Sequence, residues 1–276
     1  MTNMRVNSIG IFTNPKNDGA LDAVEAVRLA ASVRGISCFI DKSLLDIEQF
    51  KGLDTTETNT PDLMVAMGGD GTILRAAGYA AEKEVPLLGI NFGRVGFLSE
   101  IDVESFSTAL DSINKEEFTL DRCMMLACCI NGGEPVHCLN EAVLYRKNFS
   151  GVVSINVNIN GADAGTVSCD GLIVSTPTGA TGYTISAGGP IIAPGLDAAI
   201  ITPICPHTLS FRPIIASNDS VIRLSQQQEG FLAMDGIEVH RIMPGDVIDI
   251  IRSERCVNFI RLGERNLFNL IRTKLS

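Results

Sequence analysis

The chain has 276 residues, of which 45% are hydrophobic and 20% charged, proportions typical of a folded globular protein with one large domain or two ordinary ones. Its formal net charge of −10 argues against nonspecific nucleic-acid binding, because proteins of that class carry basic surfaces. No apolar run suits a membrane span, and eight cysteines without a Cys-x-x-Cys pair are typical of buried, reduced thiols in a cytoplasmic protein.

The first 119 residues alternate short apolar runs with segments of helical spacing. Strands are predicted at residues 6–13, 36–40, 63–67 and 85–91, and helices at residues 20–34, 73–84 and 105–114. This alternation is typical of a parallel sheet with right-handed crossovers, in which ligands bind beyond the carboxyl ends of the strands. We therefore predict an N-terminal parallel α/β, Rossmann-like domain over residues 1–119.

The pattern changes near Leu120. Short runs with period two or high β-propensity follow at residues 125–130, 142–145, 153–159, 171–175, 221–224, 247–251 and 256–260. Gly, Asn, Asp and Pro separate them, which predicts a mainly β, sandwich-like domain over residues 120–261. Residues 267–275 are expected to form a short helix, so that the tail, residues 262–276, returns to the first domain.

The run Gly68-Gly69-Asp70-Gly71-Thr72 joins a predicted strand to a predicted helix. Its glycines allow close backbone approach to a ligand, and the amides at the helix start attract an anion. A phosphate would repel the carboxylate of Asp70 unless that group serves as a base or binds a metal, so Asp70 is the candidate catalytic residue. The alternative is an ordinary turn whose Asp caps the helix. The run is neither a Walker loop nor a Gly-x-Gly-x-x-Gly fingerprint.

Residues 68–72 resemble a signature shared by NAD kinases, diacylglycerol and sphingosine lipid kinases and, more distantly, phosphofructokinases. Other stretches are similar to NAD kinases specifically and occur in the same order: residues 89–98 (GINFGRVGFL), Asn140-Glu141, residues 170–191 (DGLIVSTPTGATGYTISAGGPI) and residues 206–213 (PHTLSFRP). An ordered match of this extent identifies the chain as resembling the NAD kinase family.

The resemblance implies an enzyme that phosphorylates the adenosine-ribose 2′-hydroxyl of NAD to give NADP. The donor would be ATP, another nucleoside triphosphate or polyphosphate, and Mg2+ or another divalent cation would assist the transfer. Asp70 would be the general base, a role that typically contributes about 10²–10⁴-fold to the rate. The resemblance also implies a homodimer or homotetramer.

The resemblance and the side-chain chemistry together suggest the nucleotide-binding residues. An amide can pair with the edge of adenine, and a carboxylate can accept hydrogen bonds from ribose hydroxyls. The expected residues are Gly71, Arg75, Asn140, Glu141, Ser168, Asp170, Thr181, Gly182, Tyr183, Thr184, Ile185 and Ser186. Each has an ordinary structural explanation when taken alone, such as a solvated helix face for Arg75 or a core aromatic for Tyr183. No side chain is expected to ligate a metal.

Four positions depart from the family pattern: Ala180, Gly182, Ser168 and Ile237. They leave open the details of the ribose and phosphate contacts, and whether NADH is also a substrate. Two other functions compete. A lipid kinase would need a membrane-binding basic or amphipathic face, which this acidic sequence lacks. A nucleotide-binding regulatory protein that has lost catalysis is disfavoured by the intact Asp70. Neither nucleic acid nor a membrane is an expected partner.

Overall fold

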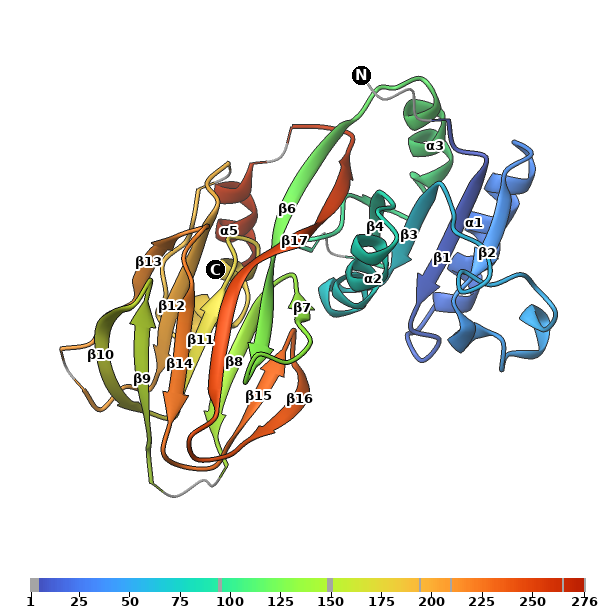
Figure 1. Ribbon diagram of the computed structural model, residues 1–276. Coiled ribbons are helices and arrows are strands. Elements are labelled where there is room, and N and C mark those ends of the chain that lie inside the picture. Colours follow the sequence, from blue (N-terminus) through green and yellow to red (C-terminus); the bar gives the residue numbers. More distant parts are fainter. Residues whose placement is uncertain are drawn as a thin grey trace. The chain divides into compact units, whose positions relative to one another are not determined.

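The computed structural model describes residues 5–93, 96–147, 151–193, 195–208, 210–264 and 266–275, without the side chains of Glu238, Val239 and Leu275 (Figure 1). The chain forms two compact units, one of residues 1–123 and 257–276, the other of residues 124–256. Two long strands, β6 (Thr119–Ile130) and β17 (Val247–Arg261), carry the chain between the units.

The first unit contains a parallel sheet. Its strands lie in the order β2 (Ser37–Ile40), β1 (Ser8–Thr13), β3 (Leu63–Met67) and β4 (Leu87–Asn91). The two-residue strand β5 (Ile101–Asp102) and the end of β17, through Phe259, each pair with β4 in parallel. Every residue of β3 and β4 is buried, as expected for apolar strands in a parallel sheet covered by helices on both faces.

The helices of this unit are α1 (Ala20–Ser32), α2 (Asp70–Glu82), α3 (Phe106–Asn114) and α5 (Leu267–Leu275), with single 3₁₀ turns at Lys42–Leu44 and Glu48–Phe50. Apolar side chains of α1 and α3 share one core with β1, β3 and β4. Helix α2 contacts the same three strands and buries several alanines, whose small side chains permit close helix–sheet packing. Because α2 follows β3 after only two residues, Asp70 lies at the carboxyl edge of the sheet.

The second unit is built from antiparallel strands. One sheet has the order β13 (Ile214–Ser217), β12 (Ala198–Ile204), β11 (Gly171–Ser175), β8 (Glu141–Arg146), β15 (Gly230–Met234) and β16 (Ile237–Ile242). The other contains β10 (Ala162–Cys169), β9 (Val153–Ile159), β14 (Ile222–Gln226) and the first residues of β17. Strand β7 (Val136–Cys138) pairs with β6.

Inward-facing residues from both sheets form the core of the second unit. The cluster includes Leu144, Ile155, Leu172, Ile201 and Ile250, all completely buried. Strand β9 alternates buried and half-buried residues, the period-two pattern of a sheet with one covered face. The predicted fold class, a parallel α/β part followed by a mainly β, sandwich-like part, is thereby confirmed.

The buried cysteines have thiols of low reactivity. Burial raises the pKa of the Cys128 thiol to about 12 and that of Cys169 to about 11. Such thiols stay protonated at neutral pH and are poor nucleophiles. Within the described ranges, no helix is both long enough and apolar enough to cross a lipid bilayer.

Candidate functional site

Asp70 is the first residue of α2, and two glycines connect it to β3. Gly68 has φ of +145°, and its amide donates to the carbonyl of Ile90 at 2.8 Å. A Cβ added at Gly68 would lie 2.8 Å from Oγ1 of Thr72, so a larger residue would force the turn to move. The glycines therefore let the chain leave the buried strand sharply and place a carboxylate where ligands of parallel sheets bind.

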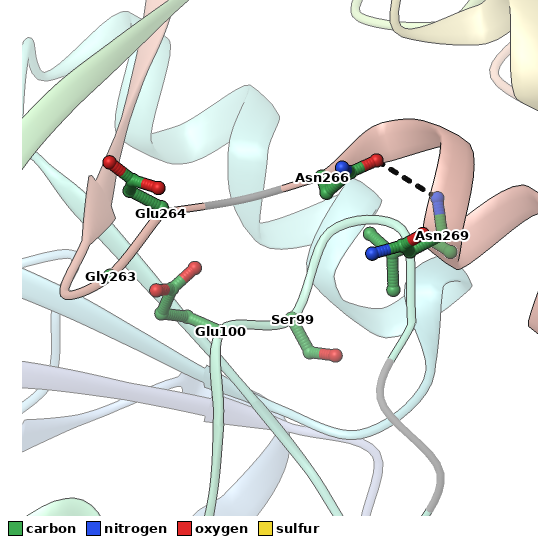
Figure 2. Close-up of a pocket in the computed structure, with 7 residues that line it drawn as sticks. Ser99, Glu100, Gly263, Glu264, Asn266 and Asn269 are labelled. Carbon is green, nitrogen blue, oxygen red and sulfur yellow. Dashed lines mark hydrogen bonds between the residues drawn. The ribbon is translucent and has the colours of Figure 1, made fainter.

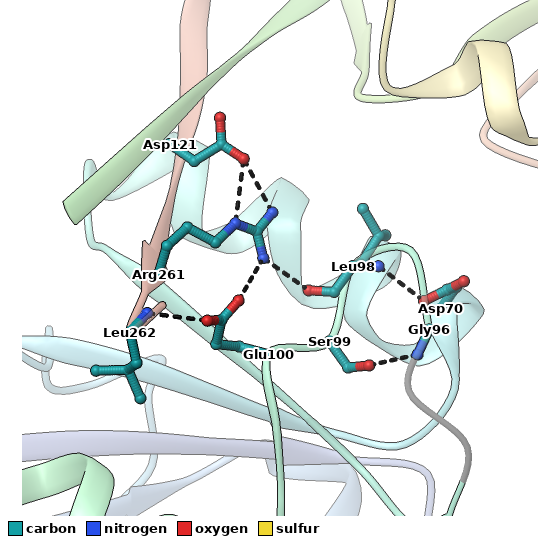
Figure 3. Close-up of polar contacts among 8 residues, drawn as sticks. All are labelled: Asp70, Gly96, Leu98, Ser99, Glu100, Asp121, Arg261 and Leu262. Atoms are coloured by element: carbon teal, nitrogen blue, oxygen red, sulfur yellow. Dashed lines mark hydrogen bonds and ion pairs between the residues drawn. The ribbon is translucent and has the colours of Figure 1, made fainter. Parts of the chain in front are cut away.

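The carboxylate of Asp70 is oriented by two backbone amides, and Figure 3 shows the one that belongs to Leu98. Oδ2 accepts from the amide of Phe97 at 2.9 Å, and Oδ1 accepts from the amide of Leu98 at 3.0 Å. A Cβ at Gly96 would lie only 2.0 Å from Oδ1. The two sequence motifs, residues 68–72 and 89–98, thus meet at one carboxyl group. Asp70 is only half-buried, and each oxygen keeps accepting capacity for another donor.

A buried arginine fixes the segment that supplies these amides. The Arg261 side chain is 6% exposed, and its Nε and Nη2 atoms lie 3.1 Å and 3.0 Å from Oδ2 of Asp121. Its Nη1 lies 3.4 Å from Oε2 of Glu100 and 3.5 Å from the carbonyl of Leu98 (Figure 3). Leu98 is thus held through its carbonyl by Arg261, while its amide holds Asp70. No sequence pattern had singled out Arg261.

The other predicted residues near Asp70 face solvent. Gly71 is exposed, with open space where a Cβ would be. Arg75 is also exposed, and its guanidinium lies 5.7 Å from the centre of the Phe12 ring, a cation–π distance. Asn91, at the end of β4, is buried; among the described residues its Oδ1 has no hydrogen-bond partner. Sequence reasoning had quoted Asn91 in its motif without giving it a role.

A cavity of about 300 Å³ lies beside this region (Figure 2). Its lining residues are Ser99, Glu100, Gly263, Glu264, Asn266, Asn269 and Leu270. Glu100 already accepts a hydrogen bond from the amide of Leu262, and Asn266 caps α5 by accepting from the amide of Asn269. Two carboxylates among the lining residues make the cavity unsuitable for a phosphate.

In the second unit, Asn140 and Glu141 present polar atoms that the fold leaves unused. Oδ1 of Asn140 and Oε2 of Glu141 are buried and, among the described residues, have no hydrogen-bond partner. A Cβ at Gly182 would lie 3.4 Å from Oε2 of Glu141 and 3.6 Å from Nδ2 of Asn140, so the loop after β11 passes directly over both side chains. Buried polar atoms without partners are uncommon in proteins and require an explanation such as a ligand.

Glu141 has a strongly perturbed carboxyl group. Burial, followed by the negative charge of Asp235, raises its pKa to about 7, and an amide hydrogen bond from Tyr183 opposes the rise. Burial also raises the pKa of Asp235, against hydrogen bonds from three backbone amides. Two neighbouring carboxyl groups with raised pKa values, one buried and one half-buried, are more typical of functional sites than of structural ones.

The segment after β11 carries the remaining predicted residues, in a 3₁₀ turn (Gly179–Thr181) and the short helix α4 (Tyr183–Ser186). The side chain of Tyr183 is 45% exposed, so Tyr183 is available as a contact surface and is not a core aromatic. Thr184, by contrast, is fully buried and donates to Oγ of Ser175 at 2.8 Å. Thr181 donates to the carbonyl of Thr178 at 3.1 Å. Ile185 is half-buried and Ser186 is exposed.

Ser168 and Asp170 lie where β10 turns into β11. The hydroxyl of Ser168 is 3.2 Å from that of Ser154, and Asp170 forms an ion pair with Arg146 at 3.1 Å. These side-chain contacts of Ser168 and Asp170 therefore run to β9 and β8, respectively. The structure brings together Asn140, Glu141, Gly182 and Tyr183, and it places Ser168 and Asp170 in separate contacts.

Comparison with known proteins identifies the family. The ATP-NAD kinase N-terminal domain matches residues 9–118, and the ATP-NAD kinase C-terminal domain matches residues 139–262. The chain belongs to the NAD kinase family. The resemblance inferred from the sequence motifs is confirmed, and the family membership makes the chain a kinase.

Members of the NAD kinase family from several bacteria align with most of this chain. The NAD kinase of Thermoanaerobacter sp. (strain X514) is 35% identical over 281 residues, covering 98% of this chain and 99% of that protein. The NAD kinase of Geotalea daltonii is 39% identical over 221 residues, which is 78% of each chain.

Two solved structures are also similar to this chain. An NAD kinase from Archaeoglobus fulgidus in complex with ATP superposes with a TM-score of 0.76 at 26% identity, covering 96% of this chain and 99% of that one. Yeast NADH kinase complexed with NADH gives a TM-score of 0.87 at 24% identity, covering 98% and 87%. At that identity the yeast enzyme shows the fold alone.

The geometry adds residues to those expected for an NAD kinase. Gly96 leaves space for the Asp70 carboxylate, and Asp235 contacts the backbone of Asn140 and Glu141. The sequence contained a signal for Asp235, because Asp-Gly between two strands is the strongest short hairpin pattern. The role of Gly96 could be found only from atomic distances.

Proposed function

We propose that this chain transfers the terminal phosphoryl group of ATP to the adenosine-ribose 2′-hydroxyl of NAD, forming NADP, with Asp70 as the general base. Membership of the NAD kinase family supports the reaction, and the ATP complex of the archaeal relative supports the donor. The observation that carries the assignment of the base is the Asp70 carboxylate, oriented by the amides of Phe97 and Leu98 and still half-exposed.

The chemistry requires such a group because an alcohol is a weak nucleophile. As the 2′-oxygen attacks the γ-phosphorus, its proton passes to an Asp70 oxygen, and the bond between the γ-phosphorus and the bridging oxygen of ADP breaks. The two amide donors keep the carboxylate in one orientation, so no reorientation is needed during transfer. Proton removal by a positioned base contributes about 10²–10⁴-fold.

The NAD site is assigned to the second unit. Oδ1 of Asn140 and Oε2 of Glu141 would accept from the adenine amine and the ribose hydroxyls, since both atoms are buried without partners among the described residues. The exposed ring of Tyr183 would pack against the nucleotide, and Gly182 leaves room beside the acceptors.

The remaining predicted residues would have less direct roles. Ser168, Asp170, Thr181, Thr184, Ile185 and Ser186 would shape the pocket, several of them through the contacts they make within the fold. Gly71 and Arg75 would face the phosphates.

A divalent cation is assigned to the substrate. Among the described residues, no group of three or more His, Cys, Asp or Glu side chains is arranged to hold a metal ion. These residues do not form a magnesium site, so no step is assigned to a metal held by the protein. The Mg2+ that accompanies ATP in kinases is bound by the phosphates of the nucleotide.

We assign the chain to the cytoplasm and to a homodimer or homotetramer. Large apolar side chains of the second unit, Leu196 and Ile215 among them, are more than half exposed, and exposed apolar residues of this kind support self-association. Light scattering of the purified protein tests the oligomer directly.

The proposed reaction is tested by incubating the purified chain with NAD, ATP and Mg2+ and measuring NADP. The expected result is NADP formation by the wild-type chain and by Asp22→Asn, a matched control at an exposed position of α1, and strongly reduced formation by Asp70→Asn. A parallel assay with diacylglycerol as acceptor tests the lipid-kinase alternative. Phosphorylation of the lipid without formation of NADP would exclude the proposed reaction.

A further inference from the structure

The turn between β15 and β16 places a carboxylate beside the predicted NAD site. Met234 pairs with Ile237, so that Asp235 and Gly236 form a two-residue turn, with φ of +50° and +76°. Positive φ at both central residues is the signature of a type I′ hairpin turn. The turn itself does not need a carboxylate, because Asn-Gly supports the same geometry.

The side chain of Asp235 accepts hydrogen bonds from three consecutive backbone amides. Oδ2 accepts from Leu139 at 2.8 Å, and Oδ1 accepts from Asn140 at 2.7 Å and from Glu141 at 3.3 Å. The amide of Asp235 donates in return to the carbonyl of Glu141 at 3.0 Å. The backbone N–H groups of Leu139, Asn140 and Glu141 therefore all donate to the carboxylate of Asp235. This is the segment whose Asn140 and Glu141 side-chain oxygens have no partner among the described residues.

Thr176 holds the same segment through its carbonyls. Oγ1 of Thr176 donates to the carbonyl of Leu139 at 2.6 Å, and the Thr176 amide donates to the carbonyl of Asn140 at 2.9 Å. The backbone polar groups of Leu139 and Asn140 are thus satisfied by Asp235 on one side and Thr176 on the other. Oδ1 of Asn140 and Oε2 of Glu141 are left to accept hydrogen bonds from a ligand.

This arrangement has an electrostatic cost for the fold. Asp235 is half-buried next to Glu141, the described partners of its carboxylate are backbone amides, and its negative charge disfavours ionisation of Glu141. The thiol of Cys138 faces the same pair and is buried. Among the described residues no cationic side chain acts on the pKa of either carboxyl group. Placing two carboxyl groups and a thiol together in this way is unfavourable for folding, which points to a functional reason for the carboxylate.

We propose that Asp235 is a positioning residue for NAD: its carboxylate orients the Leu139–Glu141 segment so that Asn140 and Glu141 present their free acceptors to the dinucleotide. This inference rests on the proposed function. Asp235 acts through backbone amides and does not itself contact the reacting atoms.

The test compares Asp235→Asn and Asp235→Gly with the full-length wild-type chain. Both variants are compatible with a type I′ turn, so the hairpin is retained. Asn keeps one acceptor oxygen, while Gly removes the whole side chain. The matched control is Asp246→Asn, because Asp246 lies in the same unit and also accepts from a backbone amide, that of Met243 at 2.7 Å, but beyond the other end of β16. The measured quantities are KM for NAD, KM for ATP, kcat and NAD affinity by calorimetry.

The expected result is a graded rise in KM and Kd for NAD, about fivefold for Asp235→Asn and more than about tenfold for Asp235→Gly, with KM for ATP and kcat within about twofold of the control. NAD parameters equal to those of Asp246→Asn would overturn the proposal, and so would an equal loss in all parameters, which indicates general disruption. If the wild type and the control neither bind NAD nor form NADP, the proposed function itself fails, and with it the role of Asp235.

Discussion

Gly96→Ala is expected to slow phosphoryl transfer while leaving NAD affinity unchanged. Gly96 is buried against the Asp70 side chain, and an added Cβ would lie 2.0 Å from Oδ1, 2.8 Å from Cγ and 3.1 Å from Oδ2. The first two distances are shorter than any ordinary van der Waals contact, and the third is tight. The added methyl group must displace either the Asp70 carboxylate or the segment whose amides orient it.

The size of the effect follows from that displacement. Restoring an ordinary contact requires a shift of roughly 1.5 Å, and a misplacement of about 1 Å at a reacting group can reduce the rate about 10²-fold. The shift also strains the amide hydrogen bonds to Asp70 at 2.9 Å and 3.0 Å, each of which contributes about 1.5–3 kcal/mol when one partner is charged. We therefore expect kcat to fall by about 100-fold, with an upper limit near 10⁴-fold, the full contribution of a general base.

The assay is steady-state NADP formation at saturating NAD and ATP, with NAD affinity measured separately by calorimetry. Gly78→Ala is the matched control: it makes the same chemical change in α2 at an exposed position with nothing within 4 Å of the new Cβ. Alanine is favoured over glycine in a helix by about 1 kcal/mol, so the control should be at least as stable as the wild type. A Gly96→Ala enzyme with kcat within about threefold of Gly78→Ala would refute the reasoning.

Two further predictions concern the second unit. Because the folded-state pKa of Glu141 is raised from 4.5 to about 7, folding favours the protonated carboxyl. The contribution of Glu141 to the free energy of unfolding should therefore be greatest below about pH 4.5 and fall by up to about 3 kcal/mol as the pH rises through 7. Urea denaturation of the wild type and of Glu141→Gln over this range should differ by this fall, and identical pH profiles for the two proteins would contradict the assignment. Tyr183→Ala should raise the Kd for NAD about tenfold, since packing of an aromatic ring on a base contributes about 1–3 kcal/mol; calorimetry giving a wild-type Kd would reject Tyr183 as an NAD contact.

Much of the fold was predictable because local periodicity and burial agree in the first unit. Strand β3 was predicted with the bounds that the structure shows, since an uninterrupted apolar run is what a central parallel strand requires. Helix α2 begins three residues earlier than predicted, at Asp70. The glycines had suggested a loop there, yet the first turn of a helix needs no internal amide partners and tolerates Gly71.

The second unit was harder to read from sequence. Strand β12 includes Pro203, which pairs with Leu172 on one side and lies beyond the residues of β12 that pair with β13, although proline normally argues against a central strand. Strand β17 is continuous from Val247 to Arg261, where two separate runs were predicted. The charged residues between the runs are half-buried or, like Glu254, exposed, and they interrupt the apolar pattern although the strand continues.

The chemistry of the site was only partly visible in the sequence. The family motifs and their order indicated Asp70, Asn140 and Glu141. The side-chain types of these residues also suit nucleotide recognition. The contacts that orient them join residues 27 to 96 positions apart, and no local pattern encodes such pairings. Asp235 illustrates the limit: its turn type can be read from Asp-Gly, but its role depends on which backbone amides the fold brings to its carboxylate.

The most direct test of the central claim is a single-turnover measurement on Asp70→Asn, with NAD prebound and ATP with Mg2+ added by rapid mixing. If Asp70 is the general base, the variant binds NAD with the wild-type Kd, while the rate constant for NADP formation falls by about 10²–10⁴-fold. A rate constant within about threefold of the wild type, with NAD bound normally, would show that another group removes the 2′-hydroxyl proton.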